Sequence, residues 1–483
     1  MIVGPRSFDD RIAIIGAGPS GIHMAYRLKE LGFRNIEILE KENRIGGRVF
    51  DVLHRGTVQQ MTFLIMPPDY NELNQLIKEY GTGSIQDVPE ATVDFFAIAR
   101  LLYPEYTRGA SDTELRMRLR REVIRYSILH RRLFGIYIPY LMQRPRNARV
   151  RRAIRGTVSQ FLRRNRMPLI ETTVMYFYQT LFGYQQPHRV SAVYGLMWIT
   201  PKFCHALLDQ SVPLFSFFDS GLISLLQTLI HNYNIEIKLN TDIKRITRSR
   251  DMQNGNVQIH CSNKFDKSRT FIEYYDFLIV SPSMRDLLNV MDASPVERMI
   301  FSRQITDTYF ISSLIDSPYG IKSDRPNIAH AKTLLRYDFE PNVHVDIFAM
   351  TQNYSGSTFR LGFTPGGYDG KRILSSVYYQ LGRLDPRIPA VGLDAEHKLR
   401  RYMIQMQRIP YSVIARFITP YHTRFSVSDM DKGIIWNVLD LQGHKNTWYI
   451  GASVTYDTAG AVIQYNNRLL RNYALPGSGY RAL

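Results

Sequence analysis

The feature that most constrains this chain is a glycine-rich turn between a short apolar strand and an amphipathic helix. Residues Arg11–Ile15 have the character of a β-strand, and residues 16–21 follow with the pattern G-x-G-x-x-G. Apolar residues then recur with helical spacing up to Gly32. A second strand, residues 35–39, ends in Glu40, whose carboxylate would accept hydrogen bonds from a ribose. This βαβ unit predicts a dinucleotide site in an α/β fold.

Each residue of the turn has a separate physical task in such a site. Gly16 permits the tight turn, Gly18 lets the backbone approach a pyrophosphate, and Gly21 lets the helix pack closely on the sheet. Pro19 and Ser20 open the helix, whose N-terminal N–H groups and partial positive charge would hold the phosphates. A glycine turn in an unrelated βα unit is the alternative interpretation.

The residues after Glu40 favour FAD over a nicotinamide cofactor. Lys41 begins a stretch that continues to Gly46, Gly47 and Arg48, an extension typical of flavoproteins. The two glycines allow backbone contact with the flavin-side phosphate or ribityl chain, and Arg48 can lie along the phosphate and flavin. We therefore predict FAD as the cofactor and place Lys41, Gly47 and Arg48 in its site.

Segments far along the chain complete this prediction. Residues 446–452 have the character of a strand that ends at Gly451, and a helix is expected from 458 to 470. The N-terminus of that helix would point at the flavin and stabilise negative charge on its reduced form. Ile243 lies in a segment expected to meet the adenine. The cofactor residues added here are Ile243, Gly451, Gly460, Ala461 and Val462.

Composition narrows the class of protein further. The chain has 483 residues, 45% of them hydrophobic, enough for two or three domains with large cores. Two cysteines exclude a disulfide scaffold and a cysteine-based zinc site, and we expect no metal. We find no apolar stretch of membrane-spanning length and no secretory pattern. We expect a cytoplasmic protein that can lie peripherally on membranes.

The positive charge is concentrated in one window. Residues 116–166 hold sixteen arginines and one acid, Glu122, in a chain whose formal net charge is +18. Apolar residues alternate with the arginines, which indicates helix, and Leu133, Phe134, Ile136 and Ile138 could insert into lipid. We expect an anionic membrane surface as a partner of Arg116–Arg166, against the plainer interpretation of a solvated helix face. No nucleic-acid-binding motif is present, so nucleic acid is not expected.

The chain resembles the flavin-containing amine oxidase superfamily, and within it the FAD-dependent polyunsaturated fatty acid isomerases. The resemblance rests on residues 11–19, Pro68–Tyr70, Phe182–Tyr184 and 441–451. It implies a Rossmann-like FAD-binding domain of the amine oxidase type with an α+β substrate domain. The expected FAD-binding domain is discontinuous and covers residues 1–90, 210–285 and 425–483. The expected substrate domain covers residues 91–209, mostly helical, and 286–424, with an antiparallel sheet.

The function that the resemblance implies is hydride chemistry on an apolar substrate. An oxidoreductase or isomerase of this type takes a hydride from an unsaturated fatty acyl chain, and aromatic faces stabilise the cation that remains. Phe182 and Tyr184 are the candidate catalytic residues, as an aromatic wall of the substrate site. Ordinary core packing is the alternative for both side chains.

Two other functions stay open. The first is an FAD-dependent amine oxidase that releases peroxide, and the second is a degenerate flavin-binding protein without turnover. Thr62, Ala452 and Asp457 stand where the superfamily usually has a glycine, an acid and, in monoamine oxidases, an aromatic residue. Residues 86–96 lack the arginine with which the isomerases bind a carboxylate. The sequence fixes neither the substrate nor the oligomeric state.

Overall fold

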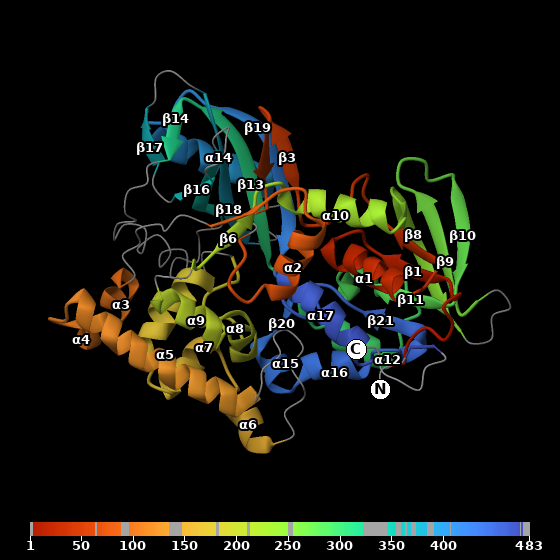
Figure 1. The fold of residues 1–483 in the computed structure, drawn as a ribbon, viewed down its shortest axis with the longest axis horizontal. Coiled ribbons are helices and arrows are strands. Elements are labelled where there is room, and N and C mark those ends of the chain that lie inside the picture. The colour runs from red at the N-terminus through yellow and green to blue at the C-terminus, as the bar shows by residue number, and fades with distance from the viewer. Residues whose placement is uncertain are drawn as a thin grey trace.

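The structure is a computed structural model, and it combines a parallel sheet, an antiparallel sheet and a group of helices (Figure 1). It describes residues 3–62, 65–87, 96–134, 147–179, 183–209, 213–249, 255–321, 345–353, 359–362, 365–368, 373–383, 391–405, 407–473 and 475–476.

A five-stranded parallel sheet is built around the N-terminal strand. In spatial order its strands are β21 (Thr447–Tyr449), β11 (Phe277–Val280), β1 (Ile12–Ile15), β2 (Ile36–Leu39) and β7 (Glu236–Lys238). All four residues of β1 are buried, as expected for the centre of a parallel sheet covered on both faces. The two predicted strands that flank the glycine turn are confirmed.

Helices from distant parts of the chain pack beside each other against this sheet. Helix α1 (Pro19–Glu30) contacts α10 (Gly221–Asn232) and α17 (Ala459–Arg471), and α17 also contacts α2 (Asn71–Tyr80). Proline at the first helical position of α1 suits its fixed φ, and Gly32, at φ +99°, follows the helix end. Figure 1 shows blue α17 beside red α1, so the two ends of the chain meet in one layer.

Smaller strands and helices border the parallel sheet. An antiparallel three-stranded sheet contains β8 (Thr241–Arg248), β9 (Val257–Asn263) and β10 (Thr270–Tyr275). The neighbouring helices are α11 (Met284–Leu287), α12 (Pro295–Phe301), α15 (Val427–Asp431), α16 (Ile434–Asp440) and the 3₁₀ helix η2 (His444–Asn446).

A second large sheet is antiparallel and lies over the same core. Its spatial order is β16 (Phe359–Gly362), β15 (Val345–Asn353), β18 (Leu374–Arg383), β13 (Thr308–Ser317) and β19 (Ser412–Tyr421). Helix α14 (Val391–Gln405) packs against it. Two-stranded pairs are β3 (Asp51–His54) with β4 (Thr57–Gln60), β5 (Ile85–Asp87) with β6 (Ser216–Phe218), β12 (Gln304–Ile305) with β20 (Arg424–Phe425), and β14 (Tyr319–Ile321) with β17 (Pro365–Tyr368).

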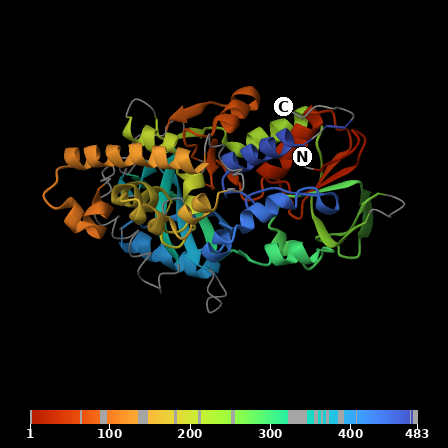
Figure 2. The same ribbon diagram turned by 90° about the horizontal axis from the view of Figure 1, so that it is seen from below.

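The remaining helices form one group at the end of the molecule opposite the three-stranded sheet, as Figures 1 and 2 show. They are α3 (Ala97–Leu102), α4 (Pro104–Thr107), α5 (Asp112–Phe134), α6 (Ala148–Ala153), α7 (Val158–Arg164), the π-helix η1 (Ile170–Gln179), α8 (Ala192–Trp198) and α9 (Pro201–Leu208). Within the ranges that the structure describes, no helix is long and apolar enough to cross a membrane. The limits of the two expected domains stay a prediction.

Candidate cofactor and substrate site

The carboxyl ends of the parallel strands meet at one edge of the sheet. Gly16 follows β1, Glu40 follows β2, Ser281 follows β11, and Gly451 follows β21 after one intervening residue. Strand β1 lies between β2, which follows it along the chain, and the later strand β11, so the order in which strands are added to the sheet reverses at β1. In open α/β sheets a ligand binds outside the carboxyl ends at such a switch point.

The glycine turn leaves an open approach to its backbone. Gly16 has φ +96°, a left-handed value that favours glycine. A Cβ atom added at Gly18 would find only the Cα atom of Gly47, 3.9 Å away, whereas one added at Gly21 would lie 2.0 Å from the carbonyl oxygen of Gly16. There is therefore room for further atoms beside Gly18, whereas Gly21 is required by packing.

This space suits a phosphate. Gly18 is the N-cap of α1, and no side chain caps that helix, so its first N–H groups have no side-chain acceptor. The loop that contains Gly46 and Gly47 is held against the glycine turn, because the N–H of Gly46 donates to the carbonyl of Ala17 at 2.8 Å. The residues present therefore fit the pyrophosphate of FAD.

Glu40 is buried at the end of β2 and is already ordered by the backbone. Its carboxylate accepts hydrogen bonds from the N–H groups of Ala17 at 2.7 Å and Glu42 at 2.8 Å. The start of β8 lies beside it, because the N–H of Thr241 donates to the carbonyl of Glu40 at 2.8 Å. Ile243, two residues further along β8, is half-buried, and Lys41 is exposed.

The start of α17 lies next to this edge. Thr458 caps the helix, and its hydroxyl accepts a hydrogen bond from the N–H of Ala461 at 3.1 Å. Gly460 lets the ring of Tyr70 approach, since a Cβ atom there would lie 2.6 Å from that ring. Ala461 and Val462 are buried.

Other predicted residues at this end also have defined places. Gly451 has φ +88°, and an added Cβ atom would lie 2.2 Å from the carbonyl oxygen of Ser281. Ser20, in the first turn of α1, is tied to α17 because its carbonyl accepts from the side-chain amide of Asn466 at 2.8 Å. The two halves of the predicted cofactor site are therefore joined directly.

An ion pair links the flavin motif to the substrate side. The guanidinium of Arg48 contacts the carboxylate of Asp457. That carboxylate also accepts a hydrogen bond from the backbone N–H of His422 at 2.8 Å. The hydroxyl of Tyr184 donates to the backbone carbonyl of Asp457 at 2.9 Å. Asp457, one of the residues that departs from the superfamily pattern, thus has a structural partner in this chain.

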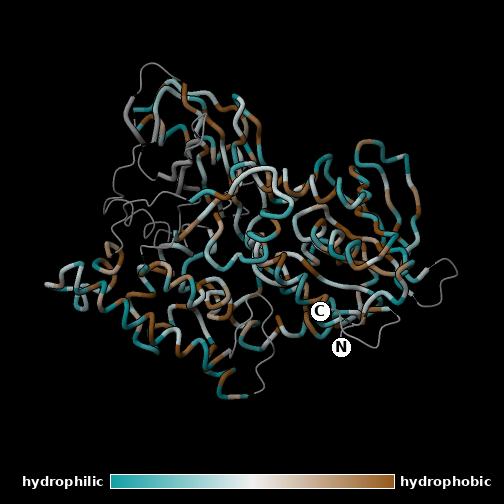
Figure 3. Tube along the Cα trace, in the orientation of Figure 1, coloured by the Kyte–Doolittle hydropathy of each residue, from teal (hydrophilic) through white to brown (hydrophobic). Residues whose placement is uncertain are grey.

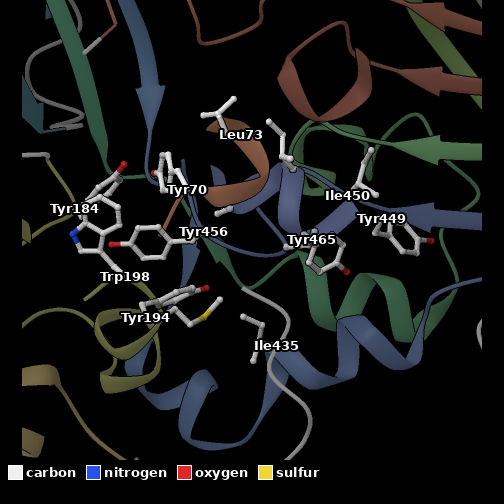
Figure 4. Close-up of a cluster of buried hydrophobic side chains, with 14 of the residues drawn as sticks. Tyr70, Leu73, Tyr184, Tyr194, Trp198, Ile435, Tyr449, Ile450, Tyr456 and Tyr465 are labelled. Atoms are coloured by element: carbon white, nitrogen blue, oxygen red, sulfur yellow. The ribbon is translucent and has the colours of Figure 1, made fainter. Parts of the chain in front are cut away.

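A group of rings lies on the other side of Asp457. This aromatic cluster consists of Tyr184, Tyr194, Trp198, Tyr421, His422 and Tyr456. Tyr184 stacks on Tyr421 with ring centroids 5.6 Å apart, and its centroid lies 4.9 Å from that of Tyr456. Tyr456 in turn stacks on Trp198 at 5.8 Å. Figure 4 shows Tyr184, Tyr194, Trp198 and Tyr456 together, with Tyr70 beside them.

His422 and Tyr456 bring buried polar atoms into the aromatic cluster. Both ring nitrogens of His422 and the hydroxyl of Tyr456 are buried and have no hydrogen-bond partner among the described residues. Burial, with a smaller contribution from the charges of Arg424 and Arg48, holds the pKa of His422 well below its usual range, so its ring is neutral. Burial also raises the pKa of Tyr456 well above its usual value. Unsatisfied buried groups of this kind are rare and are suited to a ligand.

The structure brings most of the predicted residues together. The glycine turn, Glu40, Arg48, Gly451 and the start of α17 lie around one edge, and Tyr184 joins them through Asp457. Phe182 lies outside the described residues. Sequence reasoning missed His422 and Tyr456, for which the only local signals are a polar residue after a strand and a tyrosine near a predicted strand end.

The sequence is similar to those of known flavin-dependent proteins. The sequence model of the family described as flavin-containing amine oxidoreductase matches residues 19–296, more than half of the chain. A polyenoic fatty acid isomerase from Ptilota filicina is 33% identical over 78 residues, which is 16% of this chain and 16% of that relative. The chain therefore matches about a sixth of this curated relative's length.

Solved structures share the fold over nearly the whole chain. A CLA-producing fatty acid isomerase from P. acnes has a TM-score of 0.72 at 18% identity and covers 98% of this chain and 100% of its own. A cyclohexylamine oxidase from Brevibacterium oxydans has a TM-score of 0.57 at 12% identity, with 95% and 98% covered. The predicted resemblance, the α/β fold class with its FAD-binding and substrate parts, and FAD as the cofactor are confirmed.

Proposed function

The chain belongs to the flavin-containing amine oxidoreductase family, and from this premise we propose that it is an FAD-dependent enzyme that takes a hydride from an apolar, unsaturated acyl chain. The observation that carries the proposal is the buried aromatic cluster, which adjoins the Arg48–Asp457 pair of the cofactor site. Bound FAD accepts a hydride and returns it, which no side chain can do.

The aromatic cluster suits a substrate that becomes cationic. Loss of a hydride from the methylene between two double bonds leaves a delocalised pentadienyl cation. The faces of Tyr184, Tyr456 and Trp198 would stabilise such a cation by about 0.5–2 kcal/mol for each favourable contact. Return of the hydride to another carbon of the same chain gives conjugated double bonds and consumes no oxidant.

The polar atoms of the aromatic cluster favour an uncharged polar group on the substrate. The ring of His422 is neutral, and the hydroxyl of Tyr456 is free to donate. Arg48 is already paired with Asp457, and Arg424 is paired with Asp307 at 2.7 Å. Among the described residues of this region, the nearby guanidinium groups thus have carboxylate partners. An ester carbonyl or a protonated acid fits better than a carboxylate.

The same pairing argues against the amine oxidase alternative. An ammonium substrate would need an unpaired carboxylate, and the carboxylate of Asp457, a residue that borders the aromatic cluster, is occupied by Arg48. The degenerate alternative rests on Thr62 and Ala452. Thr62 has a local use, since its hydroxyl accepts a hydrogen bond from the N–H of Phe50 at 3.1 Å.

The test is a product assay with purified FAD-loaded protein. Without oxygen, linoleic acid and its methyl ester should both yield conjugated dienes, and the ester should be the better substrate at neutral pH. Cyclohexylamine should not reduce the bound FAD. Peroxide release with amines when oxygen is supplied, and no diene from either lipid, would contradict the proposal and favour an amine oxidase.

Variants of the aromatic cluster sharpen this assay. Tyr456→Phe should raise KM for the methyl ester about 2- to 10-fold, the range expected for one neutral hydrogen bond. Tyr274→Phe is the matched control, because Tyr274 lies in β10 and its hydroxyl accepts a hydrogen bond from the side chain of Gln258 at 3.1 Å. An equal rise in KM in both variants would show that the hydroxyl of Tyr456 does not bind the substrate.

A further inference from the structure

The long helix α5 presents an outward face that the interior of the protein does not use. Its inward face is fixed by packing and by two hydrogen bonds. The hydroxyl of Tyr126 donates to the carbonyl of Ile199 at 2.6 Å, and the ring of His130 lies 3.2 Å from the carbonyl oxygen of Leu196. Leu115, Leu119 and Val123 are buried on the same side. The rotation of the helix about its axis is therefore settled.

The outward face carries a row of aliphatic side chains. Met117, Ile124 and Ile128 are 52%, 49% and 57% exposed. Because an α-helix turns by about 100° for each residue, positions 117, 124 and 128 fall within about 40° of one another. Three exposed aliphatic side chains in one line are unfavourable in water unless something covers them.

Arginines border this row on both sides. By the same helical spacing, Arg120 and Arg131 lie on one side, and Arg121, Arg125 and Arg132 on the other; all five are exposed. The only acid between positions 115 and 134 is Glu122, which is fully buried on the inward side. Beyond its first turn, α5 therefore supplies no exposed acidic side chain that would neutralise this face. The exposed Asp112 and Glu114 lie in that first turn, where Asp112 is paired with Arg100.

We propose that the outward face of α5 docks on an anionic phospholipid membrane. The aliphatic row would enter the boundary between headgroups and acyl chains, while the flanking guanidinium groups bind lipid phosphates. The helix has 23 residues and lies at one end of the molecule in both ribbon views. Figure 3 shows hydrophilic and hydrophobic residues alternating along it.

A membrane fits this face better than a nucleic acid does. The centre of the row is aliphatic, whereas binding of single-stranded nucleic acid uses exposed aromatic rings on which bases stack. The aromatic residue in this part of α5 is Tyr126, which is fully buried. Leu133, which the sequence predicts to insert into lipid, is instead half-buried against the core of the protein. Ile136 and Ile138 lie outside the described residues, as does the side chain of Phe134.

Docking there would place the membrane behind the substrate site. Helix α5 packs on α9, and its hydrogen bonds reach Leu196 and Ile199 at the end of α8. Helix α8 also carries Tyr194 and Trp198 of the aromatic cluster. The proposal goes beyond the proposed activity and does not depend on it.

The test is co-sedimentation of the FAD-loaded protein with vesicles. The protein should bind vesicles of phosphatidylcholine with phosphatidylglycerol, bind phosphatidylcholine alone at least about tenfold more weakly, and lose affinity as salt rises. Replacing Arg120, Arg121, Arg131 and Arg132 by glutamine should lower binding to the anionic vesicles by about tenfold or more. Arg125 is left intact because it donates to the carbonyl of Arg166 at 3.0 Å.

A second variant removes the same charge elsewhere. Lys244, Arg245, Lys267 and Arg269 are exposed on β8 and the turn before β10, at the opposite end of the molecule. Their replacement by glutamine should leave vesicle binding within about twofold of wild type. Replacing Met117, Ile124 and Ile128 by serine should abolish the binding that remains at high salt. Matching thermal unfolding curves would show that every variant is folded.

Three results would overturn the proposal. One is equal binding to neutral and anionic vesicles, or none to either. Another is equal loss of binding in both charge variants, which would show that net charge alone is responsible. The third is binding of single-stranded RNA under conditions in which the anionic vesicles do not bind.

Discussion

Gly18 and Gly21 stand in the same turn, and an added methyl group would meet different surroundings at the two positions. At Gly18 it would enter space that holds no protein atom closer than 3.9 Å. At Gly21 it would lie 2.0 Å from the backbone oxygen of Gly16. We therefore expect Gly18 to serve ligand binding, whereas Gly21 serves the packing of α1 next to β1.

Gly18→Ala should abolish or strongly weaken FAD binding without changing the stability of the FAD-free protein. Gly21→Ala should lower the unfolding free energy by about 1–3 kcal/mol, the usual cost of overpacking. Thermal unfolding of the FAD-free proteins and titration with FAD separate the two effects. Loss of stability in Gly18→Ala equal to that in Gly21→Ala would show that the space beside Gly18 is not a ligand site.

Glu40→Gln should weaken FAD by about 1.5–3 kcal/mol, the range for a hydrogen bond to a charged group. The variant keeps the length of the side chain but loses the charge that the N–H groups of Ala17 and Glu42 support. Fluorescence titration of the FAD-free protein with FAD measures the change. Glu42→Gln, whose carboxylate lies toward Lys264 at the surface, serves as the control and should bind FAD like wild type.

Elements differ in how far their roles can be predicted from sequence. The strand, turn and helix around Gly16–Gly21 are contiguous, so local spacing alone predicts their geometry. His422 depends on tertiary structure, because it follows β19 and reaches Asp457 in the segment before α17. Its φ of +56° is also unusual for a residue other than glycine. No local pattern predicts such a residue, because the burial of its ring and the lack of partners for its ring nitrogens arise only when the end of β19 meets the segment before α17.

The start of α17 gives a prediction at the scale of one element. Thr458→Ala should lower the unfolding free energy by about 1 kcal/mol, because the N–H of Ala461 loses its side-chain acceptor. Thr458→Ser keeps the oxygen and should behave like wild type. Urea unfolding of the FAD-free proteins measures both variants, and a loss as large for serine as for alanine would show that the cap is not responsible.

At the scale of the whole molecule, buried titratable groups set the response to pH. Burial, helped by Arg27, lowers the pKa of His23 to about 3, and burial lowers that of His130 to about 4 against a hydrogen bond to Leu196 that raises it. The unfolded chain protonates these rings near pH 6.5, and the folded chain does not. Each of these two rings therefore lowers the free energy of unfolding as pH falls below about 6.5, by about 1.4 kcal/mol per pH unit.

Buried acids oppose this trend. Burial raises the pKa of Asp51 to about 6 and that of Glu122 to about 7, so the folded chain holds protons that the unfolded chain releases. These two groups therefore raise the free energy of unfolding as pH falls from about 7 toward about 4. His23, His130 and His422 outnumber them, and from these five groups we expect a net loss of stability between about pH 6 and pH 4.5.

His130→Gln should reduce the loss of stability on acidification by up to about 1.4 kcal/mol per pH unit between about pH 6 and pH 4.5. The amide can still donate to the carbonyl of Leu196 but does not titrate. Urea unfolding at a series of pH values measures the slope. His260→Gln, on strand β9 and only half-buried, is the control. An unchanged slope in His130→Gln would mean that the ring is protonated in the folded protein.

We propose above all that this chain uses FAD to move a hydride on an apolar acyl substrate held by the aromatic cluster. The most direct measurement is rapid mixing of the FAD-loaded protein, without oxygen, with methyl linoleate carrying deuterium at the methylene between its double bonds. We expect the absorbance of oxidised FAD to fall more slowly than with the undeuterated ester, and the conjugated product to retain the transferred deuterium. No loss of that absorbance, or a product whose new hydrogen comes from water with no isotope effect, would contradict it.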